Sequence, residues 1–207
     1  MQLSTNSMSQ QLFNVKLKSK GKNYECSKVD SILESGLRSG LALRYECNNG
    51  TCGSCKARLL TGNIKQIKHY DFSLSKAELA NAEFLMCCHA PTTDIEIELD
   101  LIGDVRSIPL QKIETKVREI SFISDNMALM RLRAPRSKAL QFMAGQDVEL
   151  AFNSNRARYP LASCPCQMLD LEFHIRNNPA DDFAQALFSK ALKVKSKVIL
   201  QGPKGIF

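Results

Sequence analysis

Three cysteines within one short loop constrain this chain more than any other feature of its sequence. Cys47, Cys52 and Cys55 stand in the run YECNNGTCGSCK with the spacing C-x4-C-x2-C. A loop that aims three thiolates at one centre must turn tightly, and Gly50 and Gly53 supply residues that adopt a positive φ without strain. Backbone N–H groups in such a loop point at the sulfurs and offset their negative charge. We therefore expect this loop to hold a metal centre.

A fourth cysteine downstream completes the pattern. Cys87 follows Cys55 after 31 residues, and this arrangement is the spacing of plant-type [2Fe–2S] clusters. A structural zinc is the alternative, although zinc sites usually use two close pairs of cysteines. The segments YECNNGTCGSCKARLLTG and FLMCCHAPTTDIEIEL resemble the cluster loop and closing strand of plant-type ferredoxin domains, in the form fused to oxygenase reductases. The resemblance implies the cluster ligands Cys47, Cys52, Cys55 and Cys87.

Other cysteines and histidines of this half have different expected roles. Cys88 stands where the family commonly has glutamine and is the alternative fourth ligand. Because adjacent side chains are expected to point apart, only one of Cys87 and Cys88 can bind, and the resemblance selects Cys87. Cys26 is expected to be a buried small hydrophobe. His69 and His89 are expected on the surface or in loops.

Length and composition limit the remaining possibilities. The 207 residues, 44% hydrophobic and 24% charged, suit a globular protein of one large domain or two small ones. No apolar run approaches the ~20 residues of a membrane span. The polar N-terminus MQLSTNSMSQQ lacks the apolar core of a secretion signal and is expected to be a disordered lead-in. We therefore predict a soluble, cytoplasmic protein without membrane contact, in which disulfides are disfavoured.

Charge and cysteine content divide the chain into two predicted domains. Residues 105–207 hold 16 Lys and Arg against 9 Asp and Glu, while the first half is balanced at 12 against 12, so the net charge of +7 lies in the second half. The join is expected at 102–110, where Gly, Asp and Pro interrupt alternating segments. The predicted domains are 11–104 and 111–207. No nucleic-acid partner is expected, because the basic residues lack interleaved aromatics and a recognition motif.

Hydrophobic periodicity in the first half predicts a small α+β domain. Ser27 with Asp30 fits a capping box at the start of its main helix, and Gly36 or Gly40 fits the end. The family resemblance implies a β-grasp ferredoxin-like fold. The expected elements are strands at 13–17, 56–60 and 95–101, a helix at 29–37, and a short helix that Ser75 and Glu78 cap.

The second half has the pattern of antiparallel strands nearly throughout. Residues 169–176 alternate strictly between apolar and polar side chains, and Pro and Gly turn signals separate the other runs. One helix, with an apolar face from Phe183 to Leu192, interrupts them. The last strand is expected at 194–200, before a turn at 202–205. The predicted fold is a six-stranded antiparallel β-barrel, which makes the whole chain mainly β with an α+β first domain.

Three motifs of the second half resemble the flavin-binding barrel of the ferredoxin–NADP reductase superfamily. They are AGQDV at 144–148, RYPLAS at 158–163 and GP-x-G at 202–205, and the resemblance spans nearly all of residues 111–207. In that family an R-x-Y-[ST]-x-x-[ST] strand carries the flavin: the arginine meets the pyrophosphate, the ring packs on the isoalloxazine, and the hydroxyl bonds its edge near N5. Backbone N–H groups after Asp181-Asp182 would meet a phosphate, provided that both carboxylates point away.

This chain departs from the family's flavin motif at two positions. Ala157 stands where the family has arginine, and a bulge in the strand would restore Arg156 or Arg158 to that role. Pro160 occupies the hydroxyl position and has no donor. The residues that the resemblance places at FAD are Arg156, Arg158, Tyr159, Pro160, Leu161, Ser163, His174, Ile175, Arg176, Phe183 and Ala184.

A Cys-Pro-Cys sequence follows the predicted flavin strand. Cys164 and Cys166 are spaced too closely to make a tetrahedral metal site by themselves. We expect them to be strand-end residues near the flavin.

Together these features predict an oxidoreductase component that transfers electrons between FAD and a [2Fe–2S] cluster. The protein's part is to hold the two cofactors close and tune their potentials, without a general acid or nucleophile. By resemblance, the cluster passes single electrons to an oxygenase component or another acceptor protein. No G-x-G-x-x-G follows a strand here, so NAD(P)H is expected to act through a domain absent from this chain or through a separate reductase.

A second class of function stays open on the sequence alone. The chain is then a binding or assembly subunit, with a zinc or empty cysteine site beside a barrel that has lost its flavin. A third possibility, ferredoxin function by itself, predicts iron and sulfide without extractable FAD. A visible absorption spectrum distinguishes these hypotheses.

Overall fold

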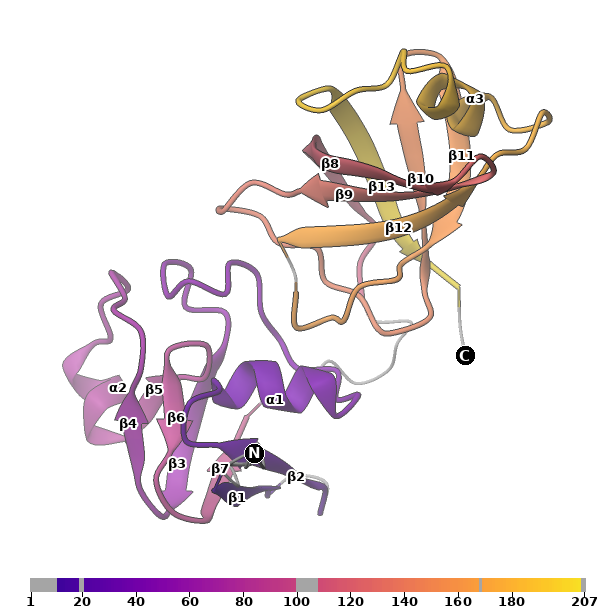
Figure 1. Ribbon diagram of the computed structural model, residues 1–207. Helices are drawn as coiled ribbons and strands as arrows, with labels where there is room; N and C mark the ends of the chain where they lie inside the picture. Colours follow the sequence, from indigo (N-terminus) through magenta and orange to yellow (C-terminus); the bar gives the residue numbers. More distant parts are fainter. Residues whose placement is uncertain (1–10, 19–20, 100–107, 168, 206–207) are drawn as a thin grey trace, which may run out of the picture.

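The computed structural model describes residues 11–18, 21–99, 108–167 and 169–205. Two large β-sheets, each with its own hydrophobic core, form an N-terminal domain (indigo to magenta in Figure 1) and a C-terminal domain (orange to yellow), and β4 and β6 pair in a small third sheet of the N-terminal domain. Most of the expected lead-in at 1–11 and most of the expected join at 102–110 lie outside the described residues. The N-terminal elements are β1 (Leu12–Leu17), β2 (Asn23–Ser27), α1 (Ile32–Arg38), β3 (Lys56–Thr61), β4 (Ile64–Gln66), α2 (Lys76–Ala80), β5 (Glu83–Leu85), β6 (His89–Pro91) and β7 (Ile95–Glu98). The C-terminal elements are β8 (Gln111–Ser124), β9 (Met127–Arg133), β10 (Asp147–Phe152), β11 (Asn155–Pro160), β12 (Asp170–Arg176), α3 (Asp182–Phe188) and β13 (Lys197–Lys204).

The N-terminal domain is built on a mixed sheet with the strand order β2-β1-β7-β3-β5. Strands β1 and β7 run parallel, and the other neighbours run antiparallel. Alternation places Val15 and Leu17 of β1 and Ile97 of β7 in one core, against Leu33 of helix α1. This sheet with one main helix confirms the α+β prediction. The predicted capping box of α2 is present as well, since Ser75 and Glu78 each bond the other's backbone N–H.

Helix α1 begins later than its sequence predicts. Its N-cap is Ser31, whose hydroxyl accepts a hydrogen bond from the Glu34 N–H (3.1 Å). The Ser27 hydroxyl instead accepts from the N–H groups of Val29 and Asp30 in a turn before the helix. The predicted cap is wrong because the pattern of a serine and an acidic residue three positions later occurs twice in succession, and only the second precedes the buried face.

The two glycines considered for the end of α1 have different roles. Gly40 follows the C-cap residue Ser39 with a φ of +78°, and its N–H donates to the Leu37 carbonyl (3.0 Å). This is the usual left-handed ending of a helix. Gly36 lies inside the helix, where an added Cβ would stand 2.5 Å from Cδ1 of Leu43. Its small size therefore serves packing rather than termination.

The C-terminal domain is one curled six-stranded sheet with the order β11-β10-β13-β8-β9-β12. Every neighbouring pair is antiparallel, which confirms the predicted architecture. Strands β11 and β12 stand at the two edges of this order, so the barrel is open between them in the hydrogen-bonding sense. Alternation along β12 buries Leu171, Phe173 and Ile175 and turns the polar residues between them outward, as predicted.

Two C-terminal elements have bounds that differ from the sequence expectation. Helix α3 ends at Phe188, so Ala191 and Leu192 follow it in a turn, although Leu192 still reaches the core. Strand β13 starts at Lys197 rather than at 194 and continues through Lys204, so the first three residues of the predicted GP-x-G turn belong to the strand and Gly205 follows it. In the described parts of the chain, no helix has the length and apolar character needed to cross a membrane.

Candidate cofactor sites

The loop that carries the three clustered cysteines joins α1 to β3. Cys47 and Cys55 are buried within it, and Cys52 is half-buried. Cys87 is buried in a turn between β5 and β6, where the Met86 N–H donates to the Cys55 carbonyl (3.1 Å). The fold therefore brings the distant cysteine to the loop, with 3.2 Å between the Cys55 and Cys87 sulfurs.

Two glycines of this loop have the predicted positive φ and are closely covered. Gly50 has a φ of +79° and Gly53 one of +76°. A Cβ on Gly50 would stand 2.2 Å from Cβ of Tyr70, and one on Gly53 would stand 2.4 Å from the ring of Phe72. The Phe72 N–H also donates to the Gly50 carbonyl (3.0 Å). The segment at 70–72 thus shields the cysteine loop from solvent, and both glycines are required by conformation and space.

The four sulfurs are arranged as two pairs, with backbone donors around them. The sulfurs of Cys55 and Cys87 lie 3.2 Å apart, and Cys47 and Cys52 are close enough for each to shift the other's pKa. Burial opposes ionisation of Cys47, but hydrogen bonds from the Asn49 backbone, from the Thr51 side chain and from Cys52 lower its pKa to about 6. Within the described residues, no three His, Cys, Asp or Glu side chains converge as ligands of a single ion. Two pairs of soft thiolates suit a centre with two irons, each bound by two cysteines.

The two adjacent cysteines of the β5–β6 turn point to the same side. The sulfurs of Cys87 and Cys88 lie 3.5 Å apart, because this segment is a turn rather than a strand, so side chains do not alternate. The expectation that they point apart is therefore wrong. Cys26 is buried as expected. His69 is exposed, whereas His89 is buried, with its Nδ1 2.9 Å from the Leu85 carbonyl.

The expected flavin tyrosine packs against the start of helix α3. Tyr159 is only 7% exposed, and its hydroxyl donates to Oδ2 of Asp181 (2.5 Å). Its ring lies 5.6 Å, between centroids, from that of Phe183, which is fully buried. The other carboxylate oxygen of Asp181 accepts from the Ala184 N–H (3.0 Å) and caps α3. One of the backbone donors expected at a phosphate is therefore engaged by a carboxylate.

The two candidate pyrophosphate arginines lie on the other face of β11. Arg156 and Arg158 are exposed and alternate with buried Tyr159. They pair with Glu149 (3.6 Å) and Asp147 (3.1 Å) of the neighbouring strand. Register between β10 and β11 runs unbroken, so the expected bulge is absent from this described strand pair. The structure therefore does not bring either arginine to the face of Tyr159.

The remaining expected flavin residues are divided between surface and core. His174 and Arg176 are exposed on β12, while Ile175 between them is fully buried, as is Ala184 of α3. Ser163 is buried, and its hydroxyl accepts a hydrogen bond from the Glu172 N–H (3.3 Å). The other two are exposed Pro160 and buried Leu161.

A buried glutamine that the sequence reasoning assigned to no role connects the ends of the second domain's motifs. Gln146, in AGQDV, accepts from the Met143 N–H (2.8 Å) and donates to the Gly205 carbonyl (3.1 Å). Gly202 packs so close to Val148 that a Cβ would stand 2.5 Å from its Cγ1. No local signal in AGQDV marks Gln146 as buried, since polar Asp147 stands beside it, and its role depends on distant Gly205.

The cysteine loop also contacts the C-terminal domain. The Tyr45 hydroxyl donates to the Leu140 carbonyl (3.0 Å), and the Ala139 N–H donates to the Glu46 carbonyl (2.9 Å). Leu169, just before β12, packs on the cores of both domains. The loop at 161–169, which continues directly from β11, therefore reaches the same interface as the cysteine loop.

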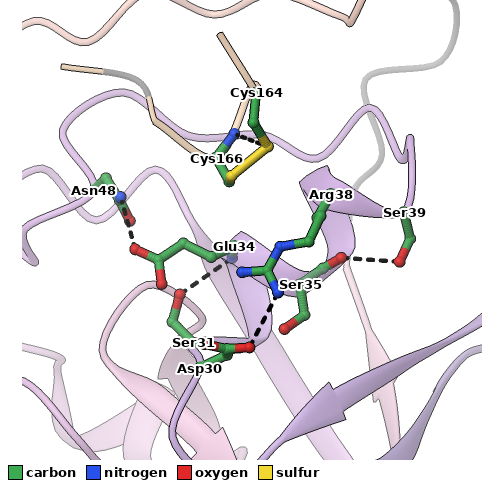
Figure 2. The surroundings of a disulfide bond; sticks show 9 residues. All are labelled: Asp30, Ser31, Glu34, Ser35, Arg38, Ser39, Asn48, Cys164 and Cys166. Carbon is green, nitrogen blue, oxygen red and sulfur yellow. Dashed lines mark hydrogen bonds and ion pairs between the residues drawn. A yellow bond between two sulfur atoms is a disulfide. The ribbon is translucent and has the colours of Figure 1, made fainter. Parts of the chain in front are cut away.

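That interface carries a feature contrary to the sequence expectation. Cys164 and Cys166 form a disulfide, although the composition argument favoured free thiols. Figure 2 shows it near side chains of α1, including Glu34 and Arg38, and near Asn48 of the cysteine loop. The sequence indicated only that the two cysteines are separated by two positions. That separation argued against a metal site and was compatible with a disulfide.

Two protein families match this chain. Residues 15–92 match the 2Fe-2S iron-sulfur cluster binding domain, and residues 114–207 match the oxidoreductase FAD-binding domain. The first family binds a [2Fe–2S] cluster and the second binds FAD. The chain therefore joins a domain of the 2Fe-2S iron-sulfur cluster binding family to a domain of the oxidoreductase FAD-binding family.

Several proteins of similar sequence are named as reductases or reductase components. The chain is 30% identical over 194 residues to the CDP-6-deoxy-L-threo-D-glycero-4-hexulose-3-dehydrase reductase of Yersinia pestis, covering 94% of this chain and 58% of that protein. It is 30% identical over 200 residues to the phenol 2-monooxygenase reductase component DmpP of Pseudomonas sp. (94% and 56%). A solved ferredoxin reductase in carbazole 1,9a-dioxygenase is 25% identical, with a TM-score of 0.45 and coverages of 95% and 61%. The chain thus spans little more than half the length of the curated relatives it matches.

Proposed function

We propose that this chain forms the electron-transfer part of a reductase, in which electrons pass from FAD to a [2Fe–2S] cluster and then singly to an acceptor protein. The observation that carries this proposal is the shared interface. The cysteine loop contacts residues 139–140 of the second domain. Asn48 of the cysteine loop also lines a cavity together with residues of the loop that follows β11. Because transfer between cofactors requires them to be close, both candidate sites need to open onto one interface, as these loops do.

In this proposal Cys47, Cys52, Cys55 and Cys87 hold the cluster. Their pairing as two sets of two, the positive-φ glycines and the backbone donors at the sulfurs support that assignment. The chain's own contribution is to exclude water, through Tyr70 and Phe72, and to offset negative charge with N–H groups such as that of Ser54, which donates to the Cys52 sulfur (3.4 Å).

FAD binding is proposed at the open side of the second sheet, between β11 and β12. These edge strands do not pair, and the loop after β11 reaches β12 through the hydrogen bond from the Ala162 N–H to the Glu172 carbonyl (2.9 Å). Exposed Arg176 supplies a cation for a diphosphate, and His174 lies on the same outer face of β12. Arg158 on the other edge pairs with Asp147 (3.1 Å), so it contributes only where the diphosphate replaces that carboxylate. When bound, FAD supplies the exchange between two-electron and one-electron steps.

The electron donor, the acceptor and the location complete the proposal. Among the relatives are reductase components of a phenol monooxygenase and a propane monooxygenase, which supports an oxygenase component as the acceptor. NAD(P)H is the proposed source of electrons, through a domain outside these residues or a separate reductase. We place the protein in the cytoplasm.

One preparation tests the proposal against its alternative. Purified chain is examined by visible absorption, and its iron, acid-labile sulfide, zinc and extractable FAD are measured. We expect iron and sulfide in equal amounts together with FAD, and bleaching of both chromophores by dithionite. A colourless protein with stoichiometric zinc would instead establish the binding or assembly subunit, and a cluster without FAD would restrict the chain to ferredoxin function.

A further inference from the structure

The Cys164–Cys166 disulfide joins two residues that are separated by one proline. The bond closes the loop Cys-Pro-Cys, with a sequence separation of two. Stabilisation by a disulfide grows with the length of the chain that it constrains, so a loop this short gains very little. Buried Pro165 already restricts the backbone at its centre. A purely structural role therefore does not account for the bond.

Both cysteines are accessible, and the bond is polarised toward one of them. Cys164 and Cys166 are each half-buried, whereas every cysteine of the other domain except Cys52 is buried. The Cys166 N–H donates to the Cys164 sulfur (3.2 Å). A hydrogen bond to a sulfur favours its thiolate form, and the sulfur that leaves as the better thiolate leaves faster in exchange. Cys164 is thus the leaving group, and Cys166 is the sulfur that an incoming thiolate attacks.

Cys166 also borders open space at the domain interface. It lines a cavity of about 380 Å³ together with Asn48 of the cysteine loop and with Arg118 and Arg131 of the second sheet. Both arginines are already paired with carboxylates, Arg118 with Asp170 and Arg131 with Glu119 and Glu172. The cavity therefore offers access to a small thiol without a strong preference for an anion.

We propose that Cys164 and Cys166 form a thiol–disulfide exchange site that small thiols reduce and small disulfides reoxidise. A thiolate attacks the Cys166 sulfur, a mixed disulfide forms there, and Cys164 leaves as a thiolate that takes a proton. A second thiol then attacks the mixed disulfide. Two thiols become one disulfide, and the protein gains two electrons and two protons as a pair of cysteine thiols. This chemistry requires neither a cluster nor FAD.

Differential alkylation of the full chain tests the proposal. Accessible free thiols of protein purified without reductant are blocked with one reagent, graded dithiothreitol is added under native conditions, and a second reagent of different mass follows. We expect the 164–166 peptide to take no first label, two second labels after reduction, and none after reoxidation with oxidised glutathione. Cys26, which is buried and free, serves as the internal control and takes no second label while the fold persists.

Direction of attack is tested with single variants. Cys166→Ser keeps the backbone N–H at 166 that favours the Cys164 thiolate, so near neutral pH it should form a mixed disulfide with oxidised glutathione at Cys164 faster than Cys164→Ser does at Cys166. Three results overturn the proposal: a first label on both cysteines before reduction, second labels only after unfolding, or equal glutathione capture by the two variants. None of these results bears on the proposed electron transfer, so the two hypotheses fail separately.

Discussion

The sulfur atoms of Cys87 and Cys88 lie 3.5 Å apart in one turn, so the cluster loop faces two thiols where one is needed. Cys87 is the closer partner of Cys55, at 3.2 Å between sulfurs. We therefore expect Cys87→Ser to remove the native cluster absorption, while Cys88→Ser keeps it. Visible absorption with iron and sulfide analysis measures both.

A double variant serves as the control for this pair. If Cys88 substitutes for Cys87, Cys87→Ser retains some iron with an altered spectrum, and the Cys87→Ser, Cys88→Ser double variant loses it. If Cys88→Ser by itself abolishes the native spectrum, the assignment of Cys87 is wrong.

Gly53 is expected to tolerate no side chain. Gly53→Ala adds the cost of a left-handed conformation, about 1–2 kcal/mol, and a clash with Phe72 at 2.4 Å. Gly40→Ala is the matched control, since its φ is +78° and no atom lies within 4 Å of the added Cβ. Urea unfolding should show Gly53→Ala to be the more destabilised by about 1–3 kcal/mol. An equal loss of unfolding free energy in Gly53→Ala and Gly40→Ala would mean that the Phe72 ring moves aside at no cost.

Tyr45 connects the domains through one hydroxyl. Tyr45→Phe leaves the buried Leu140 carbonyl without its donor, at a cost of about 1–3 kcal/mol. Amide hydrogen exchange at Ala139, which donates across the interface to Glu46, should become faster. Tyr24→Phe removes a comparable buried bond, to the Ile32 carbonyl (2.9 Å) inside the N-terminal domain, and should leave exchange at Ala139 unchanged. The same acceleration in both variants would refute a specific interface contact.

Asp170 makes stability depend on acidity. Burial would raise its pKa, but the guanidinium groups of Arg133 and Arg118 outweigh burial and lower it. Because the folded pKa lies below the unfolded value of about 3.9, the stabilisation is complete above that value and is lost as pH falls through the folded pKa. Asp170→Asn should therefore weaken the protein at neutral pH and flatten its acid unfolding curve. An unchanged curve, measured by circular dichroism, would show that other carboxylates dominate.

Asp181 sets a carboxylate at the start of α3, where the family resemblance expects a phosphate. Asp181→Asn keeps a capping oxygen for the Ala184 N–H and removes a negative charge. On the proposed function, FAD should bind several-fold more tightly by flavin fluorescence titration. The melting temperature should fall, because one amide oxygen cannot accept from both the Ala184 N–H and the buried Tyr159 hydroxyl. Asp182→Asn removes the same charge one residue later and serves as the control. An equal gain in FAD affinity in that variant would show that the capping position of Asp181 has no special effect.

Several features of this protein follow from local sequence. The spacing of Cys47, Cys52 and Cys55 and the glycines between them fix a loop whose conformation depends on its own residues, so the cluster prediction needed no tertiary information. Strict alternation along β12 likewise determined which side chains are buried, because the period of a strand is set by backbone geometry.

Tertiary structure decided what depends on distant partners. Two identical capping patterns competed at Ser27 and Ser31, and burial against the sheet selected the second. The turn between β5 and β6 decided where the side chains of Cys87 and Cys88 point. The unbroken pairing of β11 with β10 decided which face of the sheet carries Arg158. The Cys164–Cys166 disulfide lies in the loop after β11, at the contact between the two domains. Sequence determines chemistry and period, whereas register, turns and interfaces arise from contacts between residues far apart in the chain.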